Sequence, residues 1–337
     1  MNHSANQSII EATISSAIKR IENDPERSIR NLVDMGVMFC NGKFQQRFLA
    51  EAQRMLENEQ SSYYRIIPDL ISSVDSKRIT TFGINLGYQS CTKGARIIRK
   101  VEAEQNCNIP WCIFIDLQKK IYSQMKEKYF SLIEQGQSLG IYTWFVNPHS
   151  DILSTLELAE HFTDSAFVII CDPNDITEII LDEFSEVYNV FFIINYKDGI
   201  EDACALLRKR KFLFSVLYKY QEHDIENILN HSILYDLCSL HSLFSFFYAN
   251  TECPLEMQQH VYEYIKETRY KQSFQTIPFD LIYDVRFIDE IISEDAVTIS
   301  FDSNGICHTD LNNKNFTTCN LFHTSLINIF KQVVPKE

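Results

Sequence analysis

Polar residues of the types that bind and transform ligands stand at the ends of a series of short apolar runs. In chain order they are Asp116, Asn147 with His149, Asp172, Asn195 with Lys197, and Tyr218 with Lys219. If the runs are parallel strands, these side chains meet at one edge of the sheet, where such folds bind their ligands. Together they would supply the donors and acceptors of a peptide or small-molecule site.

Within this group His149 and Asp172 are the strongest functional candidates, because each precedes the residue expected to cap the following helix. The other interpretation is structural. Asn, Asp and Ser directly before a helix are preferred N-caps, and Ser150 or Asp151 fits that role. A histidine beside an asparagine supports acid–base chemistry only with a partner of defined geometry.

The stretch from Thr80 to Lys100, TTFGINLGYQSCTKGARIIRK, combines a β-branched run, spaced glycines, a cysteine and a lysine. We expect a first strand over residues 78–86, a tight polar loop and a helix that begins near Thr92. The stretch is not a P-loop, because Lys93 precedes the last glycine instead of following it. At the mouth of a barrel this loop would add four candidate ligand-binding side chains, Asn85, Tyr88, Ser90 and Lys93.

No common metal or nucleophile motif occurs: the sequence has no H-E-x-x-H, G-x-S-x-G or C-x-x-C. Cys91, Cys107 and Cys112 lie near one another in sequence, but Cys112 falls in an apolar run, where a thiol usually packs as a small hydrophobic group. A second set matches no standard zinc spacing and consists of Cys307, His308, Cys319 and His323. We therefore predict no metal site.

The apolar runs and the amphipathic helices between them predict an α/β fold with a parallel sheet. The runs are apolar almost throughout, as expected for strands covered on both faces, and occupy residues 78–86, 111–117, 140–146, 166–171, 190–196 and 212–218. We favour a partial TIM-type (β/α) barrel. The alternative is a doubly wound sheet, which lacks the support of a G-x-G-x-x-G motif after the first strand.

Three regions are expected around this pattern. Residues 1–77 would form a helical N-terminal extension, residues 78–221 the core βα units of the barrel, and residues 222–337 a helical and hairpin C-terminal region that completes it. Gly140 is expected to end a helix before a strand, and Asn304-Gly305 is a strong β-hairpin signal.

The composition predicts a globular, cytoplasmic protein. The chain has 337 residues, 45% of them hydrophobic, and a net charge of −14. That charge argues against binding nucleic acid over the whole surface, and the basic run 208–211 suits a helix C-terminus. No signal sequence is recognisable and no apolar run approaches the ~20 residues of a membrane span. We therefore expect no membrane contact, and 10 cysteines that are reduced thiols or metal ligands rather than disulfides.

The βα units, the hairpin stretch SFDSNGICHTD and the ending NLFHTSLINIF resemble the radical SAM superfamily over residues 78–331. A Gly-Asn-Ile/Leu segment followed by Ser-Leu-x-x-Ile is common in that family's tail. Asn320-Leu321 and Ser325-Leu326 with Ile329 fit this pattern. Cys319 replaces the usual glycine, and Cys307 is displaced from the family's D-x-x-G-x-x-x-x-C hairpin.

The resemblance implies a C-x-x-x-C-x-x-C loop after the first strand, whose thiolates hold a [4Fe–4S] cluster that binds S-adenosylmethionine. The stretch from Thr80 to Lys100 would stand in this place, and its single cysteine is Cys91. The glycine-rich turn that contacts S-adenosylmethionine after the second strand is also missing from CIFIDLQKK. We therefore expect that the iron–sulfur cluster and S-adenosylmethionine are lost and that no cofactor is retained.

The leading hypothesis is a radical SAM-like pseudoenzyme. It would be a non-catalytic binding or accessory protein that holds a peptide or small molecule, or that assists a cluster-bearing partner enzyme. The runner-up is an ordinary TIM-barrel lyase or hydrolase that uses His149, Asp172 and Lys197 or Lys219, in which a lysine of lowered pKa could form a Schiff base. Two further readings are a radical SAM enzyme with unusual cysteine ligands and an α/β interaction protein without a small-molecule site.

Overall fold

The computed structural model describes residues 42–336 apart from residues 150, 294 and 310–313, together with residues 16, 27, 30, 31, 33 and 34. Most of the helical extension predicted before residue 42 therefore lies outside the described residues. A search of the described part finds no helix whose length and apolar character suit a membrane crossing.

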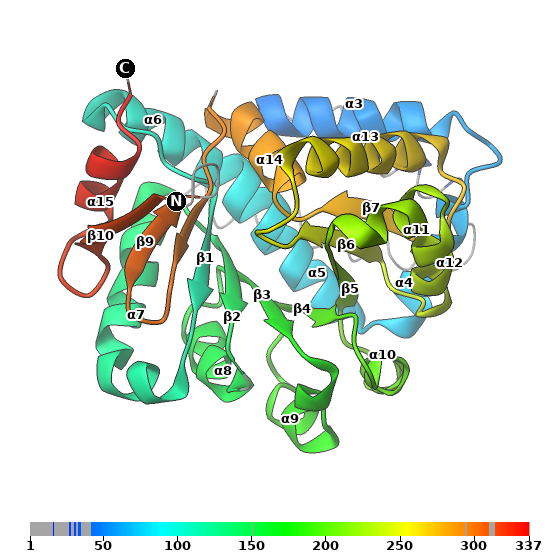
Figure 1. Ribbon diagram of the computed structural model, residues 1–337, viewed down its shortest axis with the longest axis horizontal. Helices are drawn as coiled ribbons and strands as arrows, with labels where there is room; N and C mark the ends of the chain where they lie inside the picture. Colours follow the sequence, from blue (N-terminus) through cyan, green and yellow to red (C-terminus); the bar gives the residue numbers. More distant parts are fainter. Residues whose placement is uncertain are drawn as a thin grey trace.

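One ten-stranded sheet forms the centre of the protein (Figure 1). The strands are β1 (Cys112–Asp116), β2 (Thr143–Asn147), β3 (Ala166–Cys171), β4 (Val190–Asn195), β5 (Phe214–Tyr220), β6 (Phe244–Ala249), β7 (Ile277–Asp280), β8 (Ile299–Phe301), β9 (Ile306–Thr309) and β10 (Lys314–Asn320). Their order in the sheet is β10-β9-β8-β1-β2-β3-β4-β5-β6-β7. Strands β1 to β7 are parallel and β8 is parallel to β1, while β9 is antiparallel to both β8 and β10.

Strands β1 to β7 lie side by side in the order in which they occur in the chain. A doubly wound sheet reverses its strand order at a switch point, and these seven strands have no such reversal, so that alternative is wrong. The sheet stays open, because β7 and β10 form its two edges. The fold is α/β with a partial TIM-type barrel, as predicted.

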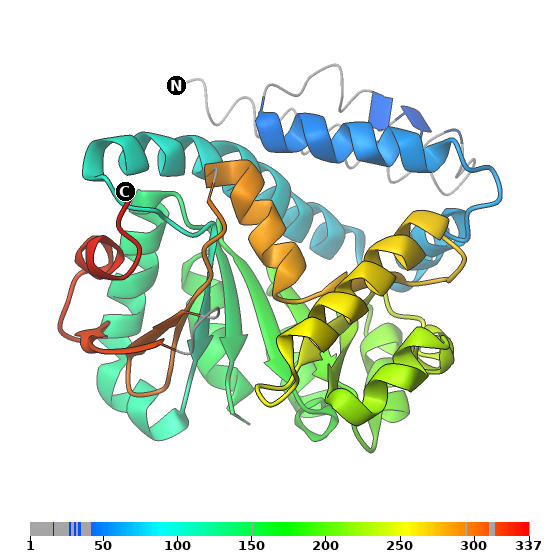
Figure 2. The same ribbon diagram turned by 45° about the horizontal axis from the view of Figure 1, so that its top comes forward.

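Helices cover the sheet and close one of its ends (Figures 1 and 2). The N-terminal helices are α3 (Lys43–Leu56), α4 (Tyr63–Ser73), α5 (Ser76–Ile84) and α6 (Ala95–Gln105), with the π-helical segment η1 (Asn85–Gly94) between the last two. The later helices are α7 (Lys119–Leu139), α8 (Ile152–His161), η2 (Pro173–Asp175), α9 (Glu178–Glu183), α10 (Ile200–Lys209), η3 (Glu222–Asp224), α11 (Ile225–Leu229), α12 (Ser232–Ser239), α13 (Leu255–Lys271), α14 (Tyr283–Ser293) and α15 (Leu326–Val333).

The outer face of the sheet packs closely against α7. Trp144 of β2 lies so near this helix that a Cβ on Gly136 would be 2.5 Å from the indole ring. Gly140 follows the helix with a φ of +98°, in the left-handed region that glycine adopts at low cost. Its amide donates to the carbonyl of Gln137, which confirms that Gly140 ends the helix.

Residues 78–86 are helical, so the predicted first strand is wrong. They belong to a continuous helical rod formed by α5, η1 and α6. Asp75 caps the rod by accepting hydrogen bonds from the amides of Lys77 and Arg78. Arg78, Phe82 and Asn85 are buried at helical spacing, so one stripe of the rod faces the protein interior. This packing outweighs the β-propensity of the run, which depends strongly on context.

The helical pattern predicted after residue 222 misses two strands of the sheet, β6 and β7. The β6 sequence, FSFFYA, follows directly on a helical apolar segment, α12. A six-residue apolar run cannot be distinguished from buried helix by periodicity alone. The three expected regions, 1–77, 78–221 and 222–337, remain a prediction, with the correction that residues 78–105 are helical.

The predicted hairpin at Asn304-Gly305 is confirmed and joins β8 to β9. Gly305 has a φ of +77°, and a Cβ there would lie 2.8 Å from the ring of Phe322. Asn320 holds the turn in place, because its Nδ2 donates to the carbonyl of Asn304 at 2.8 Å and its Oδ1 accepts from the amide of Phe322 at 2.8 Å. The tail residues that carry the family resemblance thus fix this hairpin.

Candidate functional site

The inner face of the sheet has an aromatic floor and a polar rim. Phe114 of β1 and Phe145 of β2 stack there with ring centroids 4.5 Å apart. Side chains alternate along a strand, so Asp116 and Asn147, two residues further on, point to the same face. Phe82 of α5 closes the floor from the other end of the strands by stacking on Phe191 of β4.

The first polar group on the rim joins the ends of β1 and β2. Asn147 Nδ2 donates to Asp116 Oδ1 at 3.0 Å, and His149 Nε2 lies 3.4 Å from Asp116 Oδ2. His149 has a φ of +43°, a left-handed conformation that is uncommon outside glycine and that clusters at functional sites. Both side chains are partly exposed, so the imidazole can exchange protons with a ligand while the carboxylate orients it.

The second polar group joins the ends of β3 and β4. Asp172 accepts from Asn195 Nδ2 at 2.6 Å and from Lys197 Nζ at 2.8 Å. Burial would raise the pKa of Asp172, but the hydrogen bonds from Lys197 and Asn195 outweigh it and leave that pKa below its ordinary value. An open cavity of about 380 Å³ lies beside this pair and is bounded by Asp172, Pro173, Asn174, Lys197 and Asp198.

The end of β5 divides its two candidate residues between opposite faces. Lys219 points to the inner face. Leu217 of β5 pairs with Asn195 of β4, which points to that face, and side chains two residues apart along a strand lie on the same face. Burial lowers the pKa of Lys219, and the charge of Lys197 lowers it further. Tyr218 points to the outer face, where its hydroxyl donates to Asp224 at 3.2 Å. Tyr218 therefore lies away from the polar rim, contrary to the prediction that it joins the mouth.

Asp172 also has a structural role in the backbone next to the rim, whereas His149 does not act as a cap. Asp172 occupies the N-cap position of η2, and its amide donates to Asp175 Oδ2 at 3.0 Å. The prediction that Asp172 only precedes the capping residue is therefore wrong, although its carboxylate binds Asn195 and Lys197. For His149 the prediction holds, since Asp151 is the N-cap of α8.

The four candidates from the stretch around Cys91 lie at the opposite end of the barrel. Asn85 donates to the carbonyls of Thr163 and Ser165, in the loop before β3. The hydroxyls of Ser90 and Thr143 are 2.7 Å apart, at the start of β2. These contacts close the N-terminal ends of the strands, so the predicted place of this stretch at the mouth is wrong.

The other two candidates of that stretch follow the same segment. The ammonium group of Lys93 lies 4.7 Å from the ring centroid of Tyr142, just before β2. Tyr88 is half-buried within η1. Because residues 78–86 form a helix and not the predicted strand, all four candidates lie at the N-terminal ends of the strands and not at the predicted mouth of the barrel.

Sequence reasoning missed one aspartate–histidine pair on the rim, at the end of β8. Asp302 and His308 lie 3.4 Å apart, and Asp302 Oδ1 accepts from the amides of Asn304 and Ile306 in the hairpin turn. Because β8 pairs with β1, Asp302 follows Phe301 in the same register as Asp116 follows Ile115. No local signal shows this pairing, which joins two strands far apart in the chain.

The cysteine thiols are dispersed across the described residues. Cys91 is buried in η1, Cys107 and Cys112 lie before and at the start of β1, and Cys171 ends β3. Burial raises the pKa of the thiols of Cys91 and Cys171. Among the described residues no group of three or more His, Cys, Asp or Glu side chains is arranged to hold a metal ion.

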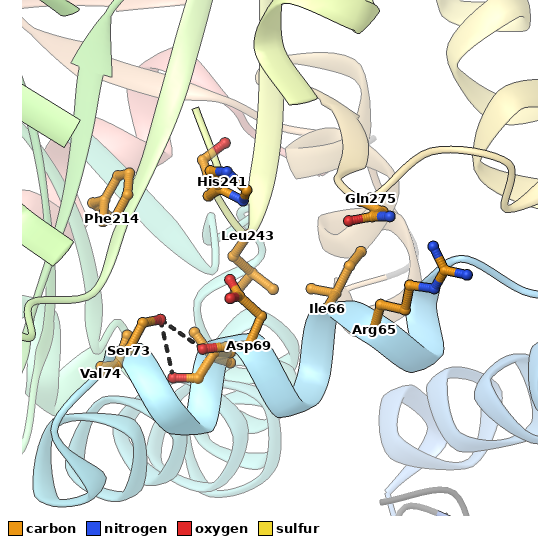
Figure 3. Close-up of a pocket in the computed structure, with 11 residues that line it drawn as sticks. Arg65, Ile66, Asp69, Ser73, Val74, Phe214, His241, Leu243 and Gln275 are labelled. Atoms are coloured by element: carbon orange, nitrogen blue, oxygen red, sulfur yellow. Dashed lines mark hydrogen bonds between the residues drawn. The ribbon is translucent and has the colours of Figure 1, made fainter. Parts of the chain in front are cut away.

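A separate cavity of about 260 Å³ lies between α4 and the segments that lead into β5 and β6 (Figure 3). Its apolar lining includes Ile66, Val74 and Phe214. Arg65 and Asp69, both on α4, also line it. The carboxylate of Asp69 is held by the guanidinium of Arg208. None of the predicted site residues lines this cavity, so it is distinct from the polar rim.

Comparisons with known proteins give weak likenesses only. No family model matches the sequence, and no curated protein matches it significantly. Among solved structures, a crystal structure of SuiB from Streptococcus suis covers 80% of this chain and 81% of its own, with 10% identity and a TM-score of 0.49. SuiB bound to S-adenosylmethionine covers 71% of this chain and 67% of its own, with 10% identity and a TM-score of 0.48.

A third structure, SuiB bound to its precursor peptide SuiA, covers 71% of this chain and 68% of its own, with 9% identity and a TM-score of 0.48. A protein from Aquifex aeolicus reaches a TM-score of 0.37 at 13% identity and covers 61% of this chain and 89% of its own. With every one of these TM-scores below 0.5, the likeness assigns neither a family nor a ligand to this chain.

Proposed function

We propose that this protein is a binding barrel that holds a peptide or a small molecule at the C-terminal ends of its strands. The observation that carries the proposal is the rim itself: Asp116, Asn147 and His149 form one bonded group and Asp172, Asn195 and Lys197 another. A concave face with an apolar floor and a few convergent polar groups is the usual form of a ligand site.

We propose further that the barrel works without an iron–sulfur cluster and without S-adenosylmethionine. The loop that follows β1 begins Leu117-Gln118, and no cysteine occurs between Cys112 and Cys171. A [4Fe–4S] cluster needs thiolates gathered at one place. Cys91, which stood nearest to the expected motif, is buried at the opposite end of the barrel, so the described residues do not fit such a cluster.

On this account the chain is a radical SAM-like pseudoenzyme of the cytoplasm with an accessory role, which presents a ligand to a cluster-bearing partner enzyme. The support for the radical SAM-like assignment is the resemblance in the tail and the placement of its residues. Asn320 fixes the hairpin, and Leu326 docks its amide on Gln135 of α7 at 2.9 Å. The tail motif therefore serves the fold, whether or not the chemistry of the resembled family is retained.

The binding proposal is tested with a ligand-detected NMR screen of short peptides and metabolites. The variant Asp172→Asn/Lys197→Met removes both charges of the rim pair together, so neither charge of the pair is left without its partner. A matched control, Glu178→Gln/Lys209→Met, removes an exposed pair of 2.9 Å between α9 and α10. We expect the bound ligands to lose their signals with the rim variant only. Equal signals for both variants would contradict the proposal.

A second candidate function is supported by Lys219. A lysine whose pKa is lowered at the mouth of a barrel can attack a carbonyl carbon, with loss of water, to form an imine. Lys197 suits this role less well, because it is paired with Asp172. Borohydride treatment in the presence of carbonyl compounds tests the lyase version. A label on Lys219 that is absent from Lys219→Arg would favour it, and no label would remove it.

A further inference from the structure

We propose that the ligand of this rim carries an anionic group next to an N–H or O–H donor, and that Lys219 binds the anion while Asn195 accepts the donor. The carboxyl terminus of a peptide has this combination, with its last backbone N–H beside the carboxylate. The inference rests on the proposed binding function and names the class of ligand.

The first observation is an ammonium group left without a close partner. Among the described residues, Lys219 makes no hydrogen bond and no ion pair, and its side chain is exposed on the inner face. Two neighbouring side chains already have carboxylate partners: Lys197 contacts Asp172 at 2.8 Å, and His149 contacts Asp116 at 3.4 Å. The rim therefore has one lysine whose charge a ligand can neutralise.

The second observation is a buried acceptor beside the same pair. Asn195 is 7% exposed, its Nδ2 donates to Asp172, and its Oδ1 has no hydrogen-bond partner among the described residues. A buried polar atom without a partner is destabilising, because it has lost its hydrogen bonds to water. An N–H from a ligand would satisfy this oxygen. An anion alone would not, because it has no donor to give.

The unpaired ammonium group of Lys219 favours an anion over a cationic ligand. Its pKa is lowered by burial and then by Lys197, while Asp172 and Asp116 act in the opposite direction without outweighing them. A bound carboxylate would favour the charged lysine and raise that pKa again.

The test uses protein with ¹³C-methylated lysines and three probes. These are the N-acetylated dipeptide Gly-Ala with a free carboxyl terminus, the same peptide as its C-terminal amide, and inorganic sulfate. We compare the unmodified sequence with Lys219→Met, Lys219→Arg and a matched control, Lys100→Met. Lys100 is 75% exposed and belongs to α6, a helix that lies at the other end of the sheet (Figure 1). Thermal melts of each variant show that the fold is retained.

We expect the free acid to bind about tenfold more tightly than the amide, a difference of about 1.4 kcal/mol in binding free energy. The bound acid should also raise the pKa of Lys219, as read from the NMR signal of its methyl groups. Lys219→Met should weaken binding of the acid about tenfold, and Lys100→Met should leave it unchanged. Lys219→Arg keeps the charge and should retain binding within about threefold. Because arginine forms no imine, this result also separates anion binding from the Schiff-base function.

Four outcomes would overturn the inference. Equal affinity for the acid and the amide removes the role of the anion, and unchanged affinity in Lys219→Met removes Lys219. Sulfate binding as tight as that of the acid removes the donor assigned to Asn195. If neither peptide binds while screened ligands still depend on the Asp172–Lys197 pair, the inference fails and the proposed binding function stands. If those ligands do not depend on the pair, both fail.

Discussion

Gly94 and Gly140 meet backbone to backbone: a methyl group on Gly94 would lie 2.2 Å from the carbonyl oxygen of Gly140. The contact joins the rod of α5, η1 and α6 to the end of α7. It holds the rod across the N-terminal ends of the strands, where Ser90 reaches Thr143. Gly94 of this stretch is thus required for close packing and not for a phosphate-binding loop.

The replacement Gly94→Ala should destabilise the protein. Its methyl group would meet backbone atoms that have no free rotation, and overpacking of this kind costs roughly 1–3 kcal/mol. The control is Gly83→Ala in α5, where a Cβ meets nothing within 4 Å and alanine gains helix propensity of about 1 kcal/mol. Urea unfolding of both variants measures the difference. A neutral Gly94→Ala would contradict the close contact.

Arg78 should contribute to stability through its buried guanidinium. It donates to the carbonyls of Phe184, Ser185 and Val187 at the end of α9 and packs over the ring of Phe212. Lysine cannot reproduce this fork of donors, so Arg78→Lys should lower the free energy of unfolding by about 2–4 kcal/mol. Arg96→Lys, on an exposed position of α6, should change it by less than about 0.5 kcal/mol. Similar effects of the two replacements would argue against the buried contact.

Asp280 should make stability depend on pH. Burial raises its pKa to about 7, although the amides of Tyr283 and Ile282 donate to it. Between the unfolded value of 3.8 and about 7, the folded state holds a proton that the unfolded state has released. The contribution of Asp280 to stability is therefore complete below pH 3.8 and is lost as the pH rises to about 7.

The variant Asp280→Asn does not titrate, and its amide oxygen can still accept both backbone N–H groups. The free energy of unfolding of the variant minus that of the unmodified protein should increase by roughly 2–4 kcal/mol from pH 4 to pH 8, because only the unmodified protein loses stability over this range. Chemical denaturation at several pH values measures this difference. A constant difference across the range would show that the pKa of Asp280 is not raised.

The sheet from β1 to β5 could be predicted from the sequence, because each strand is a short apolar run between amphipathic helices. The same assignment predicted which polar residues lie at the ends of these strands. The structure brings Asp116, Asn147 and His149 together, and it brings Asp172 together with Asn195 and Lys197. Their hydrogen bonds join neighbouring parallel strands, and that adjacency is what the βα pattern predicts.

The rest depended on contacts between distant segments. The run from Arg78 to Leu86 has a strand-like composition. Its buried residues nevertheless recur at helical spacing, because the run packs as a helix against the end of the barrel. The pairing of β8 with β1, which places Asp302 next to the rim, joins residues far apart in sequence. Tyr218 was misplaced for a simpler reason, since a shift of one residue along a strand reverses the face.

The proposal that the barrel binds its ligand without an iron–sulfur cluster has the most direct test. The measurement is the content of iron and acid-labile sulfide per chain after anaerobic reconstitution and desalting, together with the visible absorption spectrum. We predict no stoichiometric iron or sulfide and no charge-transfer band. About four irons and four sulfides per chain, with such a band, would contradict the account.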